Sequence, residues 1–256
     1  MLAVQRRTAT ITLLGRTRAA SVEDLASHLR VSLSTVRRDL HELELEGLVH
    51  RVHGGAVLAH DLVGPDADEL PLAAREVEFS QQKQAIAEAA ARLIQPGSTV
   101  LVTGGTTTAA LVPLLEQIPD VTVVTNSLDV AQRLRSASID VIVLSGTLRR
   151  PEMSLLGHLV GLSVREVHVD HVLMGVYGVD PHTGVLGASA QECETDRTLA
   201  RSAQRLTILA DAGKFARRSP HRITGVDRIS ELVTSRDAPA DDVGVLRASG
   251  VDVHVV

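Results

Sequence analysis

The chain has 256 residues, of which 44% are hydrophobic and 22% charged, an ordinary balance for a globular protein with room for one small and one medium domain. A single cysteine, Cys193, excludes an intramolecular disulfide framework, and no apolar run approaches the ~20 residues that span a bilayer. No signal-peptide pattern is present, so we expect a cytoplasmic protein without a membrane partner. Charge is uneven: residues 1–60 hold eight Arg against six Asp or Glu, a balance of +2, which leaves −7 for the rest of a chain whose net charge is −5.

Apolar spacing predicts three helices in the first 47 residues. The first runs from Gln5 to about Gly15. The second opens at an expected N-cap, Ser21, and continues to Leu29, and Arg30-Val31 then form a tight turn. The third is capped by Ser32 and ends near Gly47, which is suited to a helix C-terminus. This helix–turn–helix spacing is typical of a DNA-binding motif.

The third predicted helix has two faces. Helical geometry places Leu33, Val36, Leu40 and Leu43 on the side that must pack inward. Ser34, Arg38 and His41 fall near the opposite side, with Thr35 and Arg37 on its flanks. Hydroxyls at a helix N-terminus suit phosphate, and arginine pairs with guanine edges in the major groove. From the helix alone, a solvated charged face is an equally good interpretation.

A short basic hairpin follows the third helix. Leu48–Val52 alternates like a strand, Gly54-Gly55 supports a turn, and Ala56–Leu58 returns. Arg51 and His53 at the tip could reach the DNA backbone or the minor groove. A hairpin that only braces the helices would explain the apolar residues but not Arg51.

The combined motif is Val31-Ser32-x-x-Thr35-Val36-Arg37-Arg38-Asp39-Leu40 with Gly47-Leu48-x-x-Arg51-x-His53-Gly54-Gly55-Ala56. It resembles the N-terminal winged helix of the DeoR family of bacterial transcriptional regulators. The resemblance implies that Arg37 and Arg38 contact DNA, while Asp39 holds the arginines in place. Thr10 departs from the family, whose first helix is usually apolar. The expected DNA-binding residues are Ser32, Ser34, Thr35, Arg37, Arg38, His41, Arg51, His53, Gly54 and Gly55.

A polar segment with Gly64 and Pro65, Asp61–Glu69, is the expected linker. We therefore expect a DNA-binding domain over residues 1–60, a linker and connecting segment over 61–79, and a second domain over 80–256. After a helix that Ser80 is expected to cap, short apolar runs alternate with helical stretches, a pattern that predicts a largely parallel α/β sheet. The runs are Thr99–Val102, Val121–Thr125, Val141–Leu144, His171–Gly175, Leu206–Ala210, Glu231–Thr234 and Val251–Val256.

Polar residues follow several of these strands, where sites in parallel sheets gather. The first strand leads into Thr103-Gly104-Gly105-Thr106-Thr107, whose backbone N–H groups and hydroxyls at a helix N-terminus suit a phosphate. It matches neither GxGxxG nor a Walker loop, so no nucleotide or other cofactor is expected. Thr125-Asn126, Ser145-Gly146 and Asp211-Ala212-Gly213-Lys214 follow other strands. Each alone fits turn or capping chemistry, but their recurrence favours a ligand site.

Lysine usage singles out Lys214. Only two of the 26 basic residues are lysines, Lys83 and Lys214. A lysine retained in a chain so biased toward arginine indicates a compact point charge, which suits phosphate. For Lys83, capping or bracing its helix is the preferred interpretation.

The second domain resembles the DeoR-family sensor domain, which is similar in fold to the Rossmann-like ribose-5-phosphate isomerase and CoA-transferase group. The markers are Gly105-Thr106-Thr107, Thr125-Asn126, Gly146, Gly175-x-x-Gly178-x-Asp180, Glu192 and Leu209-Ala210-Asp211-x-x-Lys214-Phe215. The resemblance implies a phosphorylated sugar or similar metabolite as effector. The Gly-Thr loop and Lys214 would take phosphate, and Asn126, Glu192 and Asp211 would take hydroxyls or orient neighbours. The expected effector-binding residues are Thr103, Gly104, Gly105, Thr106, Thr107, Asn126, Gly146, Glu192, Asp211 and Lys214.

Three residues depart from the family pattern. Thr103 stands where Asp is usual, Ser145 replaces the first of two glycines, and Asp196 stands where a Lys is usual. Replacing a carboxylate by a hydroxyl and a cation by an anion should alter ligand preference relative to a simple sugar phosphate.

We expect a sequence-specific DNA-binding regulator, a repressor of carbohydrate or related catabolic genes. It would bind a double-stranded operator as a homo-oligomer (dimer or tetramer) and be released by the effector. One alternative is an isomerase-like enzyme with an appended DNA-binding domain, but the loop after His171–Gly175 has Val176, Tyr177 and Gly178 before Asp180 instead of carboxylates. The other alternative is an orphan regulator whose body only oligomerises. No Ser-His-Asp order, CxxC, HExxH or metal-ligand spacing is present, so no catalytic residue or metal site is expected.

Overall fold

The computed structural model describes residues 2–17, 19–52, 54–58, 75, 79–150 and 152–256. The chain divides into two compact units, Met1–Glu78 and Phe79–Val256. The expected linker Asp61–Glu69 lies outside the described residues. Among the described helices, none is both long and apolar enough to cross a membrane.

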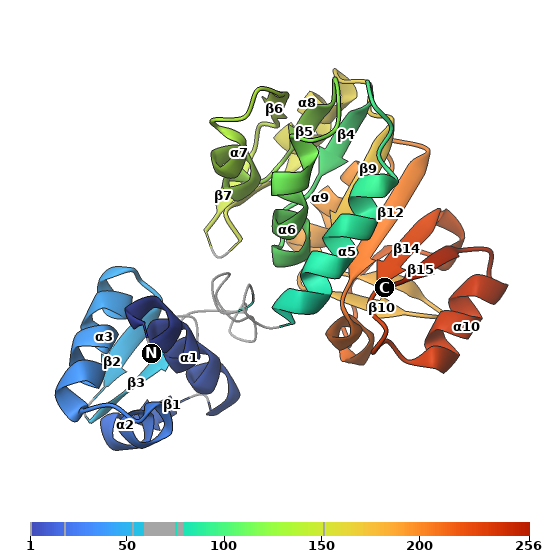
Figure 1. Ribbon diagram of the computed structural model, residues 1–256. Helices are drawn as coiled ribbons and strands as arrows, with labels where there is room; N and C mark the ends of the chain where they lie inside the picture. Colours follow the sequence, from blue (N-terminus) through green and yellow to red (C-terminus); the bar gives the residue numbers. More distant parts are fainter. Residues whose placement is uncertain (1, 18, 53, 59–74, 76–78, 151) are drawn as a thin grey trace. The chain divides into compact units, whose positions relative to one another are not determined.

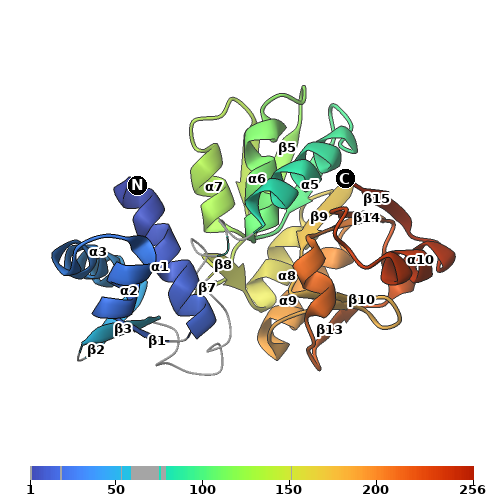
Figure 2. The ribbon, with the colours of Figure 1, turned by 60° about the horizontal axis from the view of Figure 1, so that its bottom comes forward.

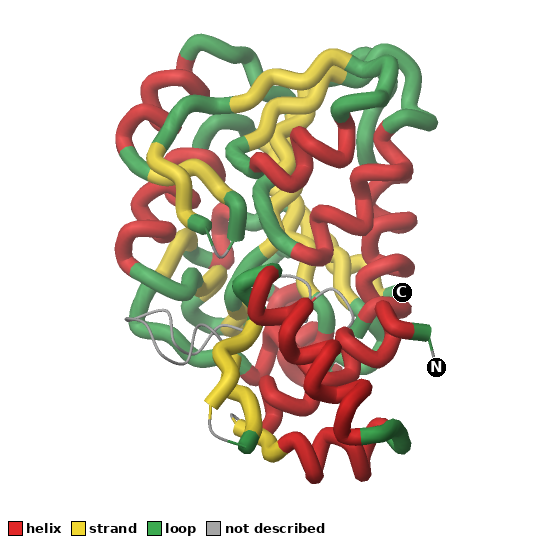
Figure 3. The backbone as a smooth tube through the Cα atoms, turned by 90° about the vertical axis from the view of Figure 1, so that its left-hand side faces the viewer, coloured by secondary structure: helices red, strands yellow, loops and turns green. Residues whose placement is uncertain are grey.

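The first unit combines three helices with a small antiparallel sheet (Figure 3). The sequence predicts the three helices and the hairpin, but not the third strand, Ala19–Ser21. Helices α1, α2 and α3 span Ala3–Thr17, Val22–Leu29 and Leu33–Leu45. Strands β1 (Ala19–Ser21), β2 (Val49–Val52) and β3 (Gly55–Leu58) pair in the order β1-β3-β2. The core joins all three helices to the hairpin and includes Ile11, Leu14, Leu25, Val36, Leu40, Leu43, Val49 and Leu58.

Local signals determine the ends of α2 and α3. The Ser21 and Ser32 side chains accept hydrogen bonds from the backbone N–H groups of Asp24 and Thr35, as expected of N-caps. At the end of α3, Gly47 adopts a φ of +70°. Its N–H donates to Glu44 O and the next N–H donates to Leu43 O, a Schellman arrangement that satisfies the last carbonyls.

Two residues of this unit differ from the simplest interpretation of their helices. The helical period predicts that Leu33 packs inward, but this first residue of α3 is 40% exposed. Thr10 is buried despite its hydroxyl, since Thr10 Oγ1 donates to Arg6 O within α1 at 3.0 Å. A buried hydroxyl is tolerated when it is bonded in this way.

The second unit contains a parallel sheet of seven strands, and all seven predicted runs are strands of it. The sheet order is β15-β14-β12-β9-β4-β5-β6. Counted among these seven strands in chain order this is 7-6-5-4-1-2-3, the doubly wound order in which strand succession reverses between β4 and β9. The strands are β4 (Thr99–Val102), β5 (Thr122–Thr125), β6 (Asp140–Val143), β9 (His171–Gly175), β12 (Arg205–Ala210), β14 (Glu231–Thr234) and β15 (Asp252–Val255).

Helices cover both faces of this sheet (Figures 1 and 2). Helices α5 (Ser80–Arg92), α6 (Thr106–Leu115) and α7 (Leu128–Leu134) pack on one face around Ile86, Leu111 and Leu134. Helices α8 (His158–Arg165), α9 (Ala190–Ala200) and α10 (Ala240–Ala248) contribute to the second core, with Val160, Leu199 and Leu246. Two buried faces explain why the strands are continuous apolar runs.

The second unit also contains short elements that the sequence did not indicate. Strands β7 (Thr147–Arg149) and β8 (Ser154–Leu156) form a hairpin, and β10 (Gly178–Asp180), β11 (Gly184–Leu186) and β13 (Arg222–Thr224) form a separate sheet. Two 3₁₀ helices span Ala212–Ala216 and Val226–Arg228. Three-residue strands are too short to produce a hydrophobic period, so their pairing follows from tertiary packing.

Candidate functional site

The outward face of α3 carries the expected polar side chains. Ser34, Arg37, Arg38 and His41 are all exposed. Ser32 Oγ lies 2.9 Å from Ser34 Oγ and 2.8 Å from Thr35 Oγ1, so three hydroxyls cluster at the N-terminus of the helix. Hydroxyls and backbone N–H groups at this end suit a phosphate, while the arginines one turn further on suit base edges.

The hairpin contributes to the same surface. Arg37 of α3 and Arg51 of β2 line one hollow together with Gly54 and Gly55 at the turn, and Glu23 of α2 contributes one carboxylate to the same lining. Arg51 is also braced toward α3, since its backbone N–H donates to Glu44 Oε1 at 3.2 Å. Two cations from separate elements therefore border one concave surface, an arrangement that fits a phosphate backbone. His53 lies outside the described residues.

The two glycines of the turn have steric roles. Gly54 has a φ of +79°, which L side chains rarely adopt. A Cβ on Gly55 would lie 2.3 Å from the carbonyl oxygen of Ala20, so β1 could not pair with β3 at its present distance. Both residues shape the hairpin through the backbone.

Asp39 has a different partner from the one that the resemblance implied. Its carboxylate is buried and forms a bidentate pair with Arg6 of α1, through Arg6 Nε and through Arg6 Nη2 at 2.9 Å. It therefore ties α3 to α1 and leaves Arg37 and Arg38 on the outer face. The expectation that Asp39 holds those two arginines was wrong, because its side of α3 faces the helix core.

In the second unit, several of the expected ligand residues follow the carboxyl ends of strands of the main sheet. Thr103 follows β4, and its Oγ1 accepts a hydrogen bond from Gly175 N at the end of β9 at 3.2 Å. A hydroxyl thus bridges the two strands that flank the reversal, where the family pattern has a carboxylate. The carboxyl ends of strands at such a reversal are the usual ligand sites of open parallel sheets.

The loop after β4 leads directly into α6. Gly105 has a φ of +134°, and its carbonyl accepts from Ala109 N, so it opens the helix. Thr106 and Thr107 form the first turn and are buried. The backbone N–H groups of this first turn and the threonine hydroxyls at the sheet edge form an arrangement suited to an anion.

Asn126 offers a free acceptor beside this loop. Its backbone oxygen accepts from Leu155 N at 2.7 Å, and its Nδ2 donates to Leu155 O at 3.1 Å. Asn126 is 2% exposed, yet its Oδ1 has no hydrogen-bond partner among the described residues. A buried acceptor without a partner is costly in a native protein, so Asn126 Oδ1 is a candidate to accept a hydrogen bond from a ligand.

The β7–β8 hairpin brings a charged cluster toward α9. Arg149 Nη1 lies 3.0 Å from Glu192 Oε1 and 4.0 Å from Glu152 Oε1. Ser189 is the N-cap of α9: its Oγ accepts from Glu192 N and donates to Glu192 Oε2. Sequence reasoning missed Arg149 and Glu152, since no local pattern indicates that this hairpin meets α9.

Asp196 belongs to this cluster and is unusual in its charge. Burial, followed by the charges of Glu192 and Glu152, raises the pKa of Asp196 to about 8, although Arg149 opposes the shift. Three carboxyl groups thus share one arginine. The Asp196 carboxyl is therefore largely neutral at pH 7, where the family pattern has a lysine cation.

Three further predicted residues have defined surroundings. Asp211 is buried, and its Oδ1 accepts from Gly213 N at 3.0 Å, so it orients the turn that carries Lys214. Lys214 is half-buried in the 3₁₀ helix that follows. A Cβ on Gly146 would lie 2.9 Å from Leu156 O, which gives this glycine a packing role.

Asp180 lies in the region where an isomerase would need carboxylates, but its side chain stabilises a turn. Its Oδ1 accepts from Thr183 N at 2.8 Å and His182 N at 2.9 Å. The hydrogen bond from Thr183 is the main cause of the lowered pKa of Asp180. The carboxylate is thus held ionised within the β10–β11 turn.

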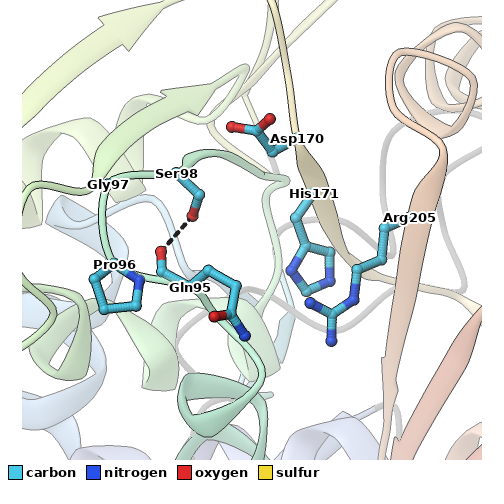
Figure 4. Close-up of a pocket in the computed structure, with 7 residues that line it drawn as sticks. All are labelled: Gln95, Pro96, Gly97, Ser98, Asp170, His171 and Arg205. Carbon is cyan, nitrogen blue, oxygen red and sulfur yellow. Dashed lines mark hydrogen bonds between the residues drawn. The ribbon is translucent and has the colours of Figure 1, made fainter.

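A separate hollow of about 320 Å³ lies at the opposite, amino end of β9 and β12 (Figure 4). Glu231 pairs with Arg205 there in a bidentate fashion, with Nη2–Oε1 at 2.6 Å. Burial and Arg205 lower the pKa of His171 to about 4, so this imidazole is neutral. The charge of Arg205 is thus neutralised by Glu231, and His171 is uncharged. The hollow is therefore a poor phosphate site. It is lined by Gln95, Pro96, Gly97, Ser98, Asp170, His171 and Arg205.

Comparisons with known proteins match both units. Residues 6–61 match the model of the DeoR-like helix-turn-helix domain, and residues 78–236 match the DeoR C terminal sensor domain. The putative aga operon transcriptional repressor of Escherichia coli O157:H7 is 32% identical, over 98% of this chain and 93% of that protein. The glycerol-3-phosphate regulon repressor of Escherichia coli K12 is 28% identical, over 96% of each chain. Among solved structures, ribose 5-phosphate isomerase from Plasmodium falciparum is 17% identical, with a TM-score of 0.39 over 53% of this chain and 52% of that chain.

Proposed function

The chain belongs to the DeoR family of DNA-binding transcriptional regulators, and from this premise we propose that it is a repressor of carbohydrate or related catabolic genes that a phosphorylated sugar or polyol releases from DNA. Its relatives are repressors by name, one of them of the glycerol-3-phosphate regulon. The observation that supports the proposal lies at the carboxyl ends of two paired strands: the Gly-Thr loop follows β4, and β5 leads into the buried Asn126, whose Oδ1 has no hydrogen-bond partner among the described residues.

For DNA, we propose that α3 enters the major groove and the hairpin contacts the backbone. Arg37 and Arg51 border one hollow, and Arg38 and His41 are exposed on the same helix. The hydroxyl cluster at Ser32 would contact a phosphate at the groove edge.

For the effector, we propose that the α6 N-terminus and Lys214 bind the phosphate, while Asn126 Oδ1 accepts from a hydroxyl. The cluster around Arg149 joins the β7–β8 hairpin to α9. It contains the carboxyl groups of Glu152, Glu192 and Asp196. An excess of carboxyl groups disfavours a second phosphate there, so a monophosphate fits better than a bisphosphate.

The DNA part is tested with duplexes selected from a random-sequence pool by the wild-type chain. Arg37→Ala and Arg38→Ala should weaken binding and reduce its salt dependence by a slope of ~0.9 for each phosphate that the variant no longer neutralises. Glu88→Gln, exposed on α5, is the control. Binding that is unchanged in both arginine variants would show that α3 does not face the DNA.

The effector part is tested by thermal shift with a panel of sugar and polyol monophosphates, with inorganic phosphate as reference. A ligand selective for the folded state should raise the unfolding temperature and release the selected DNA. Lys214→Ala should abolish both responses while the chain stays folded. A full response in Lys214→Ala would mean that the phosphate binds elsewhere.

A further inference from the structure

Two neighbouring strands at one edge of the main sheet carry three side chains of the kinds that bind metal ions. Glu231 is the first residue of β14, and Asp252 and His254 are the first and third residues of β15. Each offers one ligand atom, a carboxylate oxygen or an imidazole nitrogen, and the three atoms all lie within 4.8 Å of one another. Among the residues that the structure describes, no other three histidine, cysteine, aspartate or glutamate side chains meet in this way.

The strand register explains why these side chains meet. β14 and β15 are parallel neighbours in which Glu231 pairs with Asp252 and Val233 pairs with His254. Paired residues present their side chains on the same face of a sheet, and positions 252 and 254 share that face because side chains alternate along a strand. β15 is the last strand of the sheet, beside the C-terminus (Figure 1). No spacing in the sequence indicates this group, since only strand pairing brings Glu231 to the other two.

The imidazole of His254 lacks a partner that its position calls for. Its Nε2 is buried, yet it makes no hydrogen bond to any described residue. Asp252 Oδ2 lies 3.6 Å away, which is too far for a hydrogen bond. Two ligands of a tetrahedral zinc ion, each ~2.0–2.2 Å from the metal, are separated by roughly 3.3–3.6 Å. These two atoms therefore already have the spacing of two ligands of one ion, and an ion between them would give Nε2 its partner.

Glu231 is held in place by hydrogen bonds from β12. Arg205 donates to both carboxylate oxygens, with Nη2–Oε1 at 2.6 Å and Nε–Oε2 at 3.2 Å, and Thr207 Oγ1 donates to Oε2. These three bonds leave Oε1 with acceptor capacity for one more partner. Carboxylates that bind metals are commonly oriented by such neighbours. Because Arg205 balances the charge of Glu231, Asp252 leaves the group with one net negative charge, which favours a cation.

We propose that Glu231, Asp252 and His254 bind one zinc ion, with water as the fourth ligand. One imidazole and two carboxylates are a ligand set that suits zinc, whereas magnesium and calcium take oxygen ligands. The side chain of Asp252 is 71% exposed, so it can move aside to admit the ion. The bound ion joins β15 to β14 and stabilises the folded second unit. The site is separate from the proposed effector residues, which follow the carboxyl ends of strands, since Glu231 and Asp252 begin theirs.

The test is a titration of the untagged, chelator-treated full-length chain with ZnCl₂. Isothermal titration calorimetry should detect one equivalent of zinc per chain, and zinc should raise the unfolding temperature of the second unit. The same concentration of MgCl₂ should have neither effect. Asp252→Asn and His254→Gln should each weaken zinc binding by about tenfold or more, because each removes one of three protein ligands. Asp252→Asn should fold normally, since its side chain is exposed and its backbone N–H still donates to Ser230 O.

His168 provides the matched control. Its Nε2 lies 3.2 Å from Asp170 Oδ1, so it forms a histidine–carboxylate pair to which no described residue adds a third ligand. His168→Gln should keep the zinc equivalent. Titration with CoCl₂ gives a readout of geometry: the visible absorption of a tetrahedral Co²⁺ complex should appear in the wild type and in His168→Gln, and be absent from His254→Gln. A wild type that takes up no zinc would overturn the proposal, and so would equal losses of zinc in His168→Gln and His254→Gln.

Discussion

Replacing Asp196 by asparagine should stabilise the second unit, and increasingly so as pH rises. The pKa of Asp196 is raised from 3.8 to about 8 in the folded chain. Below pH ~4 the carboxyl is protonated in both the folded and the unfolded state, so it has no effect on stability. Between pH 4 and 8 only the unfolded state loses the proton, and the folded state becomes progressively less stable.

The magnitude follows from the same shift. A pH of 7 is about three units above the pKa of this carboxyl in the unfolded chain. At ~1.36 kcal/mol per unit, the free energy of unfolding can fall by at most ~4 kcal/mol. Asp196 is only half-buried by accessible surface, so water and movement of Glu192 should reduce the effect to on the order of 2 kcal/mol. For a unit of this size that corresponds to roughly 4–8 °C in unfolding temperature.

The assay is thermal unfolding of wild type and Asp196→Asn at several pH values between 5 and 8.5. The difference between them should grow with pH and level off above pH 8. Glu194→Gln, an exposed carboxylate of the same helix, is the matched control. A constant difference at all pH values would refute the raised pKa, because an ordinary carboxylate is ionised throughout this range.

The remaining predictions concern backbone space and a buried ion pair. Gly55→Ala should destabilise the first unit by ~1–3 kcal/mol, because the new Cβ would collide with Ala20 O. Denaturant titration measures this loss, and DNA binding should weaken with it. An unchanged free energy of unfolding would mean that β1 moves easily. Gly244→Ala, exposed in α10 with no atom within 4 Å of the new Cβ, should instead stabilise the second unit by ~0.5–1 kcal/mol. Asp39→Asn should lower the unfolding temperature of the first unit, because Arg6 would lose its buried partner; an unchanged melt would show that water replaces the pair.

Local sequence signals predicted much of the fold correctly. Ser21, Ser32 and Gly47 cap or end helices as expected, because capping depends on residues within one turn. All seven strands of the main sheet coincide with predicted apolar runs; the five inner strands are largely apolar because both of their faces are buried, whereas the edge strands β6 and β15 are more exposed. The first residue of a helix is where this reasoning failed, as Leu33 shows, because the helical period does not say where packing begins.

The candidate sites were only partly predictable. The Gly-Thr loop and Asn126 could be expected to meet, since carboxyl ends of parallel strands lie at one edge of a sheet. Arg149 could not be found, because its contact with Glu192 joins a hairpin to a helix that lies some 40 residues later in the chain. Which of the ten expected effector-binding residues bind a ligand stays a prediction.

The sequence by itself determined the main helices and strands, the caps of α2 and α3 and the two motifs that identify the family, because each of these is encoded within a few neighbouring residues. Only the tertiary structure decided the strand order, and with it the reversal between β4 and β9, the exposed edge at β6 and the crowding that raises the pKa of Asp196. The physical reason is range: capping and periodicity act over one or two turns, whereas pairing, burial and electrostatic coupling depend on which distant segments become neighbours.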